Sequence, residues 1–356
     1  VALTGEASLA ADPPFQLVAR TELAGEAVGR PVRFVMQADG PLADFTLQGQ
    51  ARTLESLPDE RFTGILQARI ATFAKQPLAQ AMVRLNGVDP AAWVAGAPTA
   101  ELDIDAELKP LGDLLGDLTG SLRVENHRPG SIGQQRLPLQ SLRTDLDVRQ
   151  GVWQLAGIDA RLPGNGRLRG EGTYRQEVLT LDLTGDRLDA HAMHDQLRPT
   201  ALAGLLRAEL AVHRQTIDAR LRDPRFAVKT KLTVDPQAIV AETVQLSAGE
   251  ARLEANGRMA LGDERPFEWH GLLQNFDPSR FARLPAARLT ARFDAQGQLK
   301  PALTLRGRFQ LRDSRIGGLA EDILGRGVGT RCGGLQGRIA GDPPVFAHGA
   351  HRLTGG

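Results

Sequence analysis

Two histidines, His191 and His194, are the side chains whose type and spacing come closest to a metal site. Neutral imidazole is a common metal ligand, but a stable site needs further donors converging on the same point. Asp189 and Asp195 are the only candidate ligands nearby, and no cysteine lies close in the sequence. We therefore interpret both histidines as surface residues and expect no metal ion.

Two pairs of carboxylates have the spacing for acid–base chemistry. Asp103 with Asp105, and Asp145 with Asp147, each place two carboxylates on one face of a predicted strand. Paired carboxylates act as acid and base in glycoside hydrolysis. Here each pair falls on the polar side of an ordinary alternation of apolar and polar residues, which favours a solvated strand face.

A glycine-rich segment, Gly164-Asn165-Gly166 with Gly170, superficially resembles a dinucleotide-binding loop. The third glycine of that fingerprint would fall at Arg169, and the residues that follow have the pattern of a strand rather than a helix, so the fingerprint fails. The sequence also lacks a Walker loop, a Gly-x-Ser-x-Gly elbow and a His-Glu-x-x-His pair. We expect no catalytic residues, no cofactor and no enzymatic activity.

Composition narrows the class of protein further. The 356 residues are 42% hydrophobic and 24% charged, with a net charge of +1, and charges of both signs alternate along the chain. Nucleic-acid binding or a polybasic membrane patch would require a basic face, so neither is expected. The single cysteine, Cys332, excludes an intrachain disulfide framework.

The sequence begins at Val1 and contains no run of 18 or more apolar residues and no signal peptide. We interpret it as a fragment, or as a chain whose N-terminus has been removed. Any membrane anchor or targeting segment would then lie outside it.

The dominant signal is alternation of apolar and polar residues, which is typical of strands with one dry and one wet face. It predicts strands over 102–109, 142–149, 179–184, 206–213, 226–235 and 303–311, with a bulge or bend at Gly307. Turns are expected at 38–41, 162–166 and 262–263. Short helices are expected only over 89–94, 189–197, 277–282 and 319–324.

A helix motif recurs along the chain. An aspartate at 89, 189 and 277 is followed four residues later by Trp93, Met193 or Phe281, then by a proline and an alternating strand. The aspartate can cap a helix N-terminus, and the later proline can end that helix. A second element, beginning at Leu162 and again at Leu246, recurs between these motifs, so each unit is several strands plus a small helix and must stack on its neighbours.

These repeats predict an organisation of the chain into stacked units. The expected divisions are a sheet region over 1–84, repeat units over 85–188 and 189–276, the start of a further repeat over 277–324, and a glycine-rich tail over 325–356 that is either disordered or outside the fold.

Together, the Asp-Pro-x-x-Trp/Phe unit, the glycine-spaced leucine unit and the long alternating strands resemble the TamB and AsmA-like family over roughly residues 1–324. The resemblance implies an all-β, elongated antiparallel sheet that curls around a hydrophobic groove. It also implies a periplasmic location, tethered to the inner membrane through a segment absent from this chain. The implied partners are phospholipid acyl chains and, through regions outside this fragment, a TamA-like outer-membrane barrel.

The apolar alternating residues are accordingly the candidate lining of a lipid groove, although periodicity alone equally suits the filled core of a sandwich. The lining predicted from the strands comprises Leu102, Ile104, Leu108, Leu142, Leu146, Val148, Leu179, Leu181, Leu183, Leu206, Leu210, Val212, Phe226, Val228, Leu232, Val234, Leu289, Phe293, Leu303, Leu305, Phe309 and Leu311.

Two other functions remain open from the sequence. The chain could be a scaffold or chaperone module that offers strand edges to outer-membrane proteins, or an adhesin-like β-solenoid. The solenoid predicts shorter coils than the observed period. Trp93, Trp153 and Trp269 are interpreted as sheet-packing residues, with the groove entrance as the functional alternative.

Overall fold

The protein is an all-β chain in this computed structural model, and its strands are antiparallel as the alternation predicts. The structure describes residues 2–27, 30–53, 62–92, 97–112, 114–284, 286–301, 304–312, 314–316 and 334–338. These residues include no helix long and apolar enough to cross a membrane. The chain divides into two compact units: unit 1 is 1–211 with 221–224, and unit 2 is 212–220 with 225–356.

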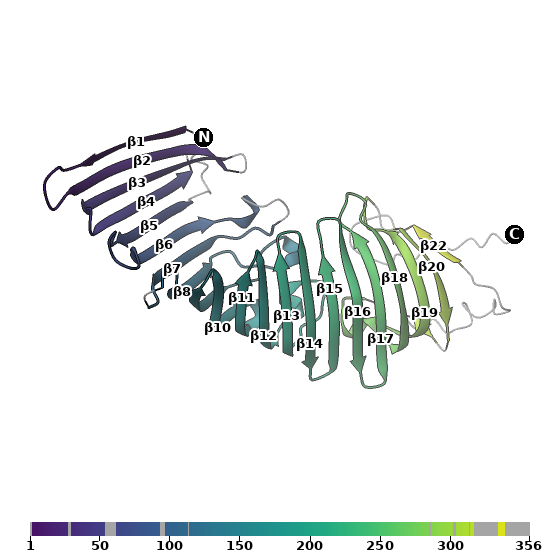
Figure 1. The fold of residues 1–356 in the computed structure, drawn as a ribbon. Helices are drawn as coiled ribbons and strands as arrows, with labels where there is room; N and C mark the ends of the chain where they lie inside the picture. The colour runs from purple at the N-terminus through teal and green to yellow at the C-terminus, as the bar shows by residue number, and fades with distance from the viewer. Residues whose placement is uncertain are drawn as a thin grey trace. The chain divides into compact units, whose positions relative to one another are not determined.

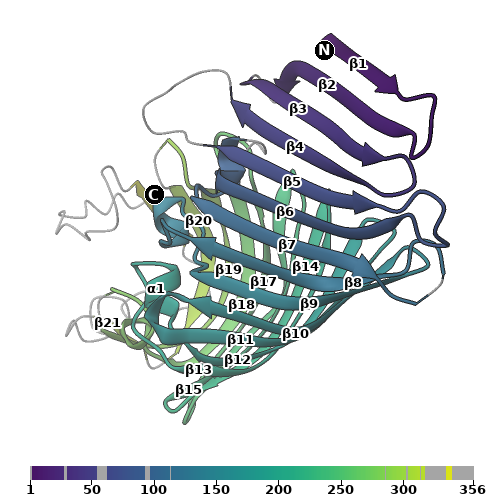
Figure 2. The ribbon, with the colours of Figure 1, turned by 90° about the vertical axis from the view of Figure 1, so that its left-hand side faces the viewer.

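Unit 1 is built on a meander in which each strand pairs with the next, as the ribbon shows (Figure 1). Its thirteen strands are β1 (Ala2–Leu9), β2 (Gln16–Ala27), β3 (Arg30–Pro41), β4 (Phe45–Thr53), β5 (Thr63–Ile70), β6 (Leu78–Val88), β7 (Leu102–Pro110), β8 (Leu118–Asn126), β9 (Ser141–Arg149), β10 (Val152–Leu162), β11 (Gly166–Arg175), β12 (Val178–Leu188) and β13 (Leu202–Ala211). Figure 2 shows that this sheet is curved.

Unit 2 continues the same pattern. Its meander is β15 (Phe226–Val234), β16 (Ala238–Ala248), β17 (Ala251–Ala260), β18 (Pro266–Phe276), β19 (Ala287–Gln298) and β20 (Thr304–Leu311). β21 (Arg315–Ile316) pairs with β19, and β22 (Gly334–Arg338) pairs with β20. β14 (Arg214–Asp223) contributes residues to both units.

In the part of the chain that the structure describes, short helices occur only where an even-numbered strand leads to an odd-numbered one. They are η1 (Pro90–Ala92), η2 (Ile132–Gln134), η3 (Pro163–Asn165), α1 (Ala190–Met193) and η4 (Pro278–Arg280). Successive strands run in opposite directions, so these connections all lie at the same end of the strands in each unit. We call this end the helical rim, and α1 lies there (Figure 2). The opposite end, where odd-numbered strands turn into even-numbered ones, is the hairpin rim.

The predicted aspartate motif is confirmed as a capped connection that recurs every six strands, after β6, β12 and β18. In α1, Asp189 Oδ1 accepts from the backbone N–H of His191 at 3.0 Å and from that of Thr200 at 3.0 Å. Asp277 Oδ1 makes the same pair of bonds to Ser279 (3.1 Å) and Ala287 (3.2 Å). One carboxylate therefore caps the helix and also fixes the start of the next strand.

The first copy has the same geometry. Asp89 Oδ1 accepts from Ala91 N–H and Ala100 N–H, both at 3.1 Å. Two residues before each aspartate the backbone has a positive φ, at Gly87 (67°), Arg187 (50°) and Asn275 (46°). The strand register shifts at the same place in all three copies. A bulge therefore ends regular pairing and aims the chain into the helix.

Phe281, four residues after Asp277, lies over the apolar face of unit 2. Its ring stacks on Phe276 at 5.3 Å and meets Phe226 edge-to-face at 5.1 Å. Phe226 begins β15, whereas Phe281 follows β18, three strands away and therefore ~14 Å along a flat sheet. The connection that contains η4 therefore lies across the apolar face of unit 2 and brings Phe281 over the start of β15.

Several predicted boundaries were wrong. The expected turn at 38–41 is part of β3, because the chain turns at 42–44 instead. Gly307 makes no bulge, since β19 and β20 pair there in unbroken register. The strand expected over 206–213 is β13, which starts at Leu202 and ends at Ala211. The helix expected over 319–324, and residues 325–333 and 339–356 of the tail, lie outside the described residues, whereas 334–338 form β22.

Candidate functional site

Rows of apolar residues run across the strands of unit 1 without interruption. Row A takes one residue from each strand, β1 to β13: Leu3, Leu23, Phe34, Ala51, Gly64, Leu85, Ile104, Val124, Leu142, Ala160, Leu168, Gly185 and Gly204. Row B is Ala7, Ala19, Ala38, Leu47, Ala68, Ala81, Leu108, Gly120, Leu146, Leu155, Gly172, Leu181 and Ala208. With strands ~4.8 Å apart, each row extends for about 58 Å.

Unit 2 has equivalent rows across β15 to β20. Row C is Val228, Leu246, Leu253, Leu273, Ala291 and Leu311. Row D is Leu232, Ala241, Gly257, Trp269, Ala295 and Gly307, and row E is Val234, Ile239, Met259, Phe267, Gly297 and Leu305. Each unit therefore has one face with a continuous apolar surface, which we call the apolar face.

The apolar face is shielded by its own curvature and side chains rather than by a second layer. Among the described residues, no large side chain is fully buried, and more than half of the buried hydrophobic residues are alanines. An alanine Cβ lies close to the backbone and is shaded by larger neighbours. Most larger side chains of the same rows, such as Leu85, Leu155 and Leu253, remain partly exposed, although Val124 and Leu146 are buried. In a closed sandwich the two inner faces would interdigitate and bury those tips. Each unit is therefore an open trough.

Aromatic rings lie across glycines of the apolar face in unit 2. A Cβ placed on Gly271 would lie 2.7 Å from Phe293 Cζ, and one placed on Gly257 would lie 2.5 Å from Trp269 Cδ2. The rings of one strand thus cover the bare backbone of the next, which flattens the surface and removes exposed peptide groups. Trp269 is a sheet-packing residue of the trough, as its sequence pattern predicts; Trp93 lies outside the described residues.

Most of the predicted lining residues lie on these faces. Rows A to E contain Ile104, Leu108, Leu142, Leu146, Leu181, Val228, Leu232, Val234 and Leu311. Further members of the same faces are Leu102, Val148, Leu179, Leu183, Leu206, Leu210, Phe226, Leu289 and Phe293. Trp153 joins them, because it pairs with Val148 on one side and with Tyr174 on the other.

One predicted lining residue does not line the trough. Val212 lies in the turn that follows β13 and is 72% exposed, because the strand ends at Ala211, two residues earlier than the alternation suggested. Leu303 lies outside the described residues. Leu305 and Phe309 are placed in β20 by their backbones alone.

Other lining residues were missed in the sequence. They include Phe34, Leu47, Leu66, Val83, Leu85, Val124, Leu155, Leu246, Leu253, Phe267 and Trp269. Alternation was present at Phe34-Met36-Ala38 and at Leu253-Ala255-Gly257, and a search that accepted alanine and glycine as apolar would have found both stretches.

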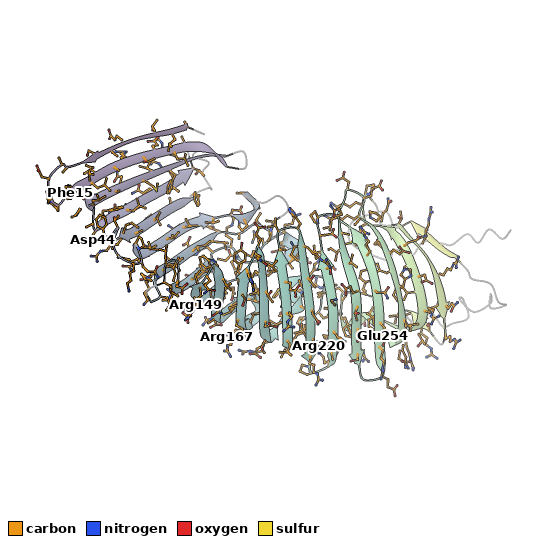
Figure 3. The ribbon with its side chains drawn as sticks, viewed as in Figure 1. Phe15, Asp44, Arg149, Arg167, Arg220 and Glu254 are labelled. Atoms are coloured by element: carbon orange, nitrogen blue, oxygen red, sulfur yellow. The ribbon has the colours of Figure 1, made fainter. Side chains whose placement is uncertain are left out.

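The opposite face of each sheet is polar and carries ion pairs between neighbouring strands. Arg84 Nε lies 2.7 Å from Asp105 Oδ1, and Lys231 Nζ lies 2.5 Å from Glu242 Oε2. Asp103, predicted to be solvated with Asp105, is 2.9 Å from His127 Nε2. Such cross-strand pairs stabilise a sheet modestly and keep this face wet. Figure 3 shows side chains standing out from the strands of both units.

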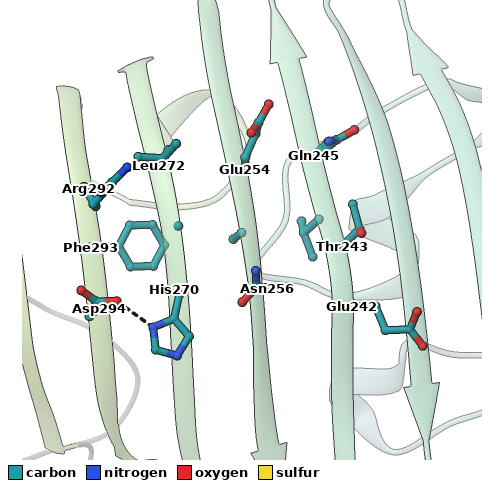
Figure 4. Close-up of a pocket in the computed structure, with 13 residues that line it drawn as sticks. Glu242, Thr243, Gln245, Glu254, Asn256, His270, Leu272, Arg292, Phe293 and Asp294 are labelled. Carbon is teal, nitrogen blue, oxygen red and sulfur yellow. Dashed lines mark hydrogen bonds and ion pairs between the residues drawn. The ribbon is translucent and has the colours of Figure 1, made fainter.

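An open hollow on the polar face of unit 2 is lined by titratable side chains that include His270, Asp294 and Glu242 (Figure 4). His270 Nδ1 lies 2.7 Å from Asp294 Oδ1, and its Nε2 lies 3.4 Å from Glu268. The hydrogen bond to Asp294 and the nearby negative charges raise the pKa of His270. His270, Asp294, Glu254 and Arg292 are exposed, and the hollow is open to solvent.

Titration of His270 gives a direct check of this geometry. A raised pKa means that the charged, Asp294-paired form persists above the usual histidine value of ~6.5 and is lost as pH rises through the new value. We expect the NMR titration midpoint of His270 to lie above that value and to fall in Asp294→Asn. A midpoint unchanged by the substitution would contradict the contact.

His191 and His194, interpreted from the sequence as surface residues, each lie beside a local polar partner. His191 Nδ1 is 2.9 Å from the carbonyl of Leu197, and His194 Nδ1 is 3.5 Å from Asp195 Oδ1. The described residues contain no group of three or more side chains arranged to hold a metal.

Comparison with known proteins adds no identification: no family model, curated protein or solved structure matches this chain.

Proposed function

We propose that each trough binds phospholipid acyl chains and lets them move along the rows, while their headgroups stay in water. The observation that carries this proposal is that the apolar rows A to E are unbroken and that most of their larger described side chains are at least partly exposed. Exposed apolar surface on this scale marks a binding site in soluble proteins. Burying acyl chain against it contributes about 0.8 kcal/mol per methylene.

The uniformity of the lining favours passage over tight capture. Movement requires similar affinity at successive positions, and a repeated lining of leucine, valine, alanine and glycine supplies that. A specific pocket would instead combine an enclosed cavity with a few convergent polar groups. In keeping with the resemblance to TamB and AsmA-like proteins, we place this segment in the periplasm, in phospholipid transport between the two membranes.

Photo-crosslinking in cells tests the proposal. A benzoylphenylalanine at Leu155 in unit 1 or at Leu246 in unit 2 should form lipid adducts that mass spectrometry identifies as phospholipid. The matched controls are the adjacent polar-face residues Gln154 and Gln245, which should form few. Polypeptide adducts at Leu155 and Leu246, with no lipid, would contradict the proposal and favour the scaffold function.

A further inference from the structure

The first hairpin turns of unit 1 present large apolar side chains to solvent. Phe15, between β1 and β2, is 43% exposed, and Phe73, between β5 and β6, is 77% exposed. Leu114 and Leu115, between β7 and β8, are 64% and 76% exposed. The intervening turn between β3 and β4 contributes Leu42. We call the described residues of these four turns, 10–15, 42–44, 71–77, 111–112 and 114–117, the apolar comb.

Within unit 1 the apolar character is confined to these turns. The remaining turns of its hairpin rim are polar: Gln150-Gly151 between β9 and β10, and Gln176-Glu177 between β11 and β12. In unit 2 the turn at 261–265 is rich in charge, whereas Val212 (72% exposed) and Leu299 (41% exposed) lie singly in other turns. Turns are ordinarily polar because they face water. The exposed apolar residues of the comb therefore distinguish it from the other turns of the hairpin rim in unit 1.

Hydrogen bonds between turns hold the comb in place. The Leu42 N–H donates to Phe15 O at 3.0 Å, and the Thr72 hydroxyl donates to Leu42 O at 2.6 Å. The buried Gln76 amide donates to the carbonyls of Leu114 and Asp117. Adjacent turns usually move independently, so these bonds fix the apolar tips before they meet a partner and lower the entropic cost of binding.

The spacing of the tips identifies the kind of surface they fit. Successive hairpins are two strands apart, so their tips are ~9.6 Å apart and the comb from Phe15 to Leu115 covers about 29 Å in a line. A protein partner anchors on a compact cluster of residues in a desolvated pocket. A line of separate tips instead suits a planar, fluid surface that admits each side chain independently, as the interface of a bilayer does.

Charge narrows the choice of membrane. The described residues of the four turns contain one base, Lys75, and three acids, Asp12, Asp44 and Asp117, of which Asp44 is paired with Arg69 of β5. An anionic lipid surface attracts clusters of lysine and arginine and would repel this net negative edge. The comb therefore suits a bilayer surface of zwitterionic lipid.

We propose that the apolar comb docks unit 1 on a zwitterionic bilayer by inserting Phe15, Phe73, Leu114 and Leu115 into the interface. The inference deepens the proposed function, because the strands that end at the comb also carry rows A and B, so docking brings the trough to its source of lipid. Membrane binding is nevertheless measurable without any transfer of lipid.

Flotation with phosphatidylcholine vesicles tests the proposal on the full chain. The double variant Phe73→Ser with Leu115→Ser should bind at least tenfold less than the wild type. The matched control, Ile132→Ser with Leu205→Ser, removes two side chains that are each 61% exposed, on the helical rim and the polar face, and should bind as the wild type does. Binding should change little with added salt or when phosphatidylglycerol is mixed in.

Three outcomes would contradict the proposal that the comb docks on a membrane. They are equal binding by the comb variant and the wild type, no binding of the wild type to phosphatidylcholine, and binding that requires phosphatidylglycerol and disappears in salt. Phospholipid loaded from detergent micelles separates the two proposals. A comb variant that still loads lipid has lost docking alone, whereas a wild type that floats but never loads lipid contradicts the trough.

Discussion

Leu155→Asp is expected to remove most of the phospholipid that unit 1 holds while leaving the sheet folded. Leu155 lies in the middle of row B, between Leu146 and Gly172 on the neighbouring strands. A carboxylate there would be stripped of water whenever an acyl chain lay across it. Burying a polar group without a partner costs about 1–3 kcal/mol in proteins and more for a charge, so lipid occupancy should fall by tenfold or more, since 1.4 kcal/mol corresponds to tenfold.

The fold should tolerate the change because Leu155 is only half-buried. Without lipid the new carboxylate can stay hydrated at the open trough, and the loss is part of the ~1.5–3 kcal/mol that full burial of a leucine contributes. Phospholipid that copurifies with the protein, measured by mass spectrometry, gives the occupancy, and the midpoint of thermal unfolding reports the fold.

Gln154→Asp is the matched control, since it adds the same charge at the adjacent, exposed position on the polar face. It should leave lipid content unchanged. Leu155→Gln, which is polar but uncharged, should lose less lipid than Leu155→Asp. Equal lipid content in all three variants would mean that row B does not hold the chains.

The strands with leucine, valine and charged residues in strict alternation were predictable from the sequence. β7 and β15 match the expected ranges closely. In β7 a charged residue separates Leu102 from Ile104, and in β15 only lysine and threonine lie between Val228 and Leu232. β4 and β17 were not predicted, since Gly49, Ala51 and Gly257 weaken the apolar signal there. In the structure these small residues lie in or beside the rows, and at Gly49 and Gly257 a neighbouring aromatic ring, Phe34 or Trp269, supplies the missing apolar surface.

The open trough could not be deduced from periodicity, because an alternating strand looks the same in a sandwich and in a single curved layer. What decides between them is whether a second sheet covers the apolar face, and that depends on contacts between segments far apart in the chain. The contact of Phe281 with Phe226 is one of these. The comb was missed for a related reason: Phe15, Phe73 and Leu115 have no shared spacing, and only strand pairing places them along one rim.

Asp277→Ala is expected to lower the free energy of unfolding of unit 2 by about 2 kcal/mol, the sum of a lost helix cap and a lost charge-assisted bond. The Asp277 carboxylate accepts from Ser279 N–H at 3.1 Å, from the Ser279 hydroxyl at 2.7 Å and from Ala287 N–H at 3.2 Å. Its loss would release η4 and, with it, the Phe281 ring that covers Phe226. Urea unfolding at neutral pH measures the effect.

Two controls isolate the cap. Asp263→Ala removes an exposed acid from the turn between β17 and β18 and should change stability little. Asp277→Asn keeps an acceptor oxygen without the charge and should cost less than Asp277→Ala. A loss in Asp277→Ala no larger than that in Asp263→Ala would contradict the assignment of the aspartate as the cap.

The pH dependence of Asp277→Asn adds a sharper test of the same contact. Burial opposes ionisation of Asp277, but the hydrogen bonds from Ser279 and the backbone of Ala287, with the nearby charge of Arg280, outweigh it and lower the pKa. A lowered folded pKa stabilises the protein fully above the unfolded value, ~3.9 for aspartate, and the stabilisation disappears as pH falls through the folded value. The advantage of wild type over Asp277→Asn should therefore be constant at neutral pH and shrink in acid. A difference that persists unchanged through that acid range would show that the charge of Asp277 does not stabilise the connection, and that the recurring aspartates act by shape alone.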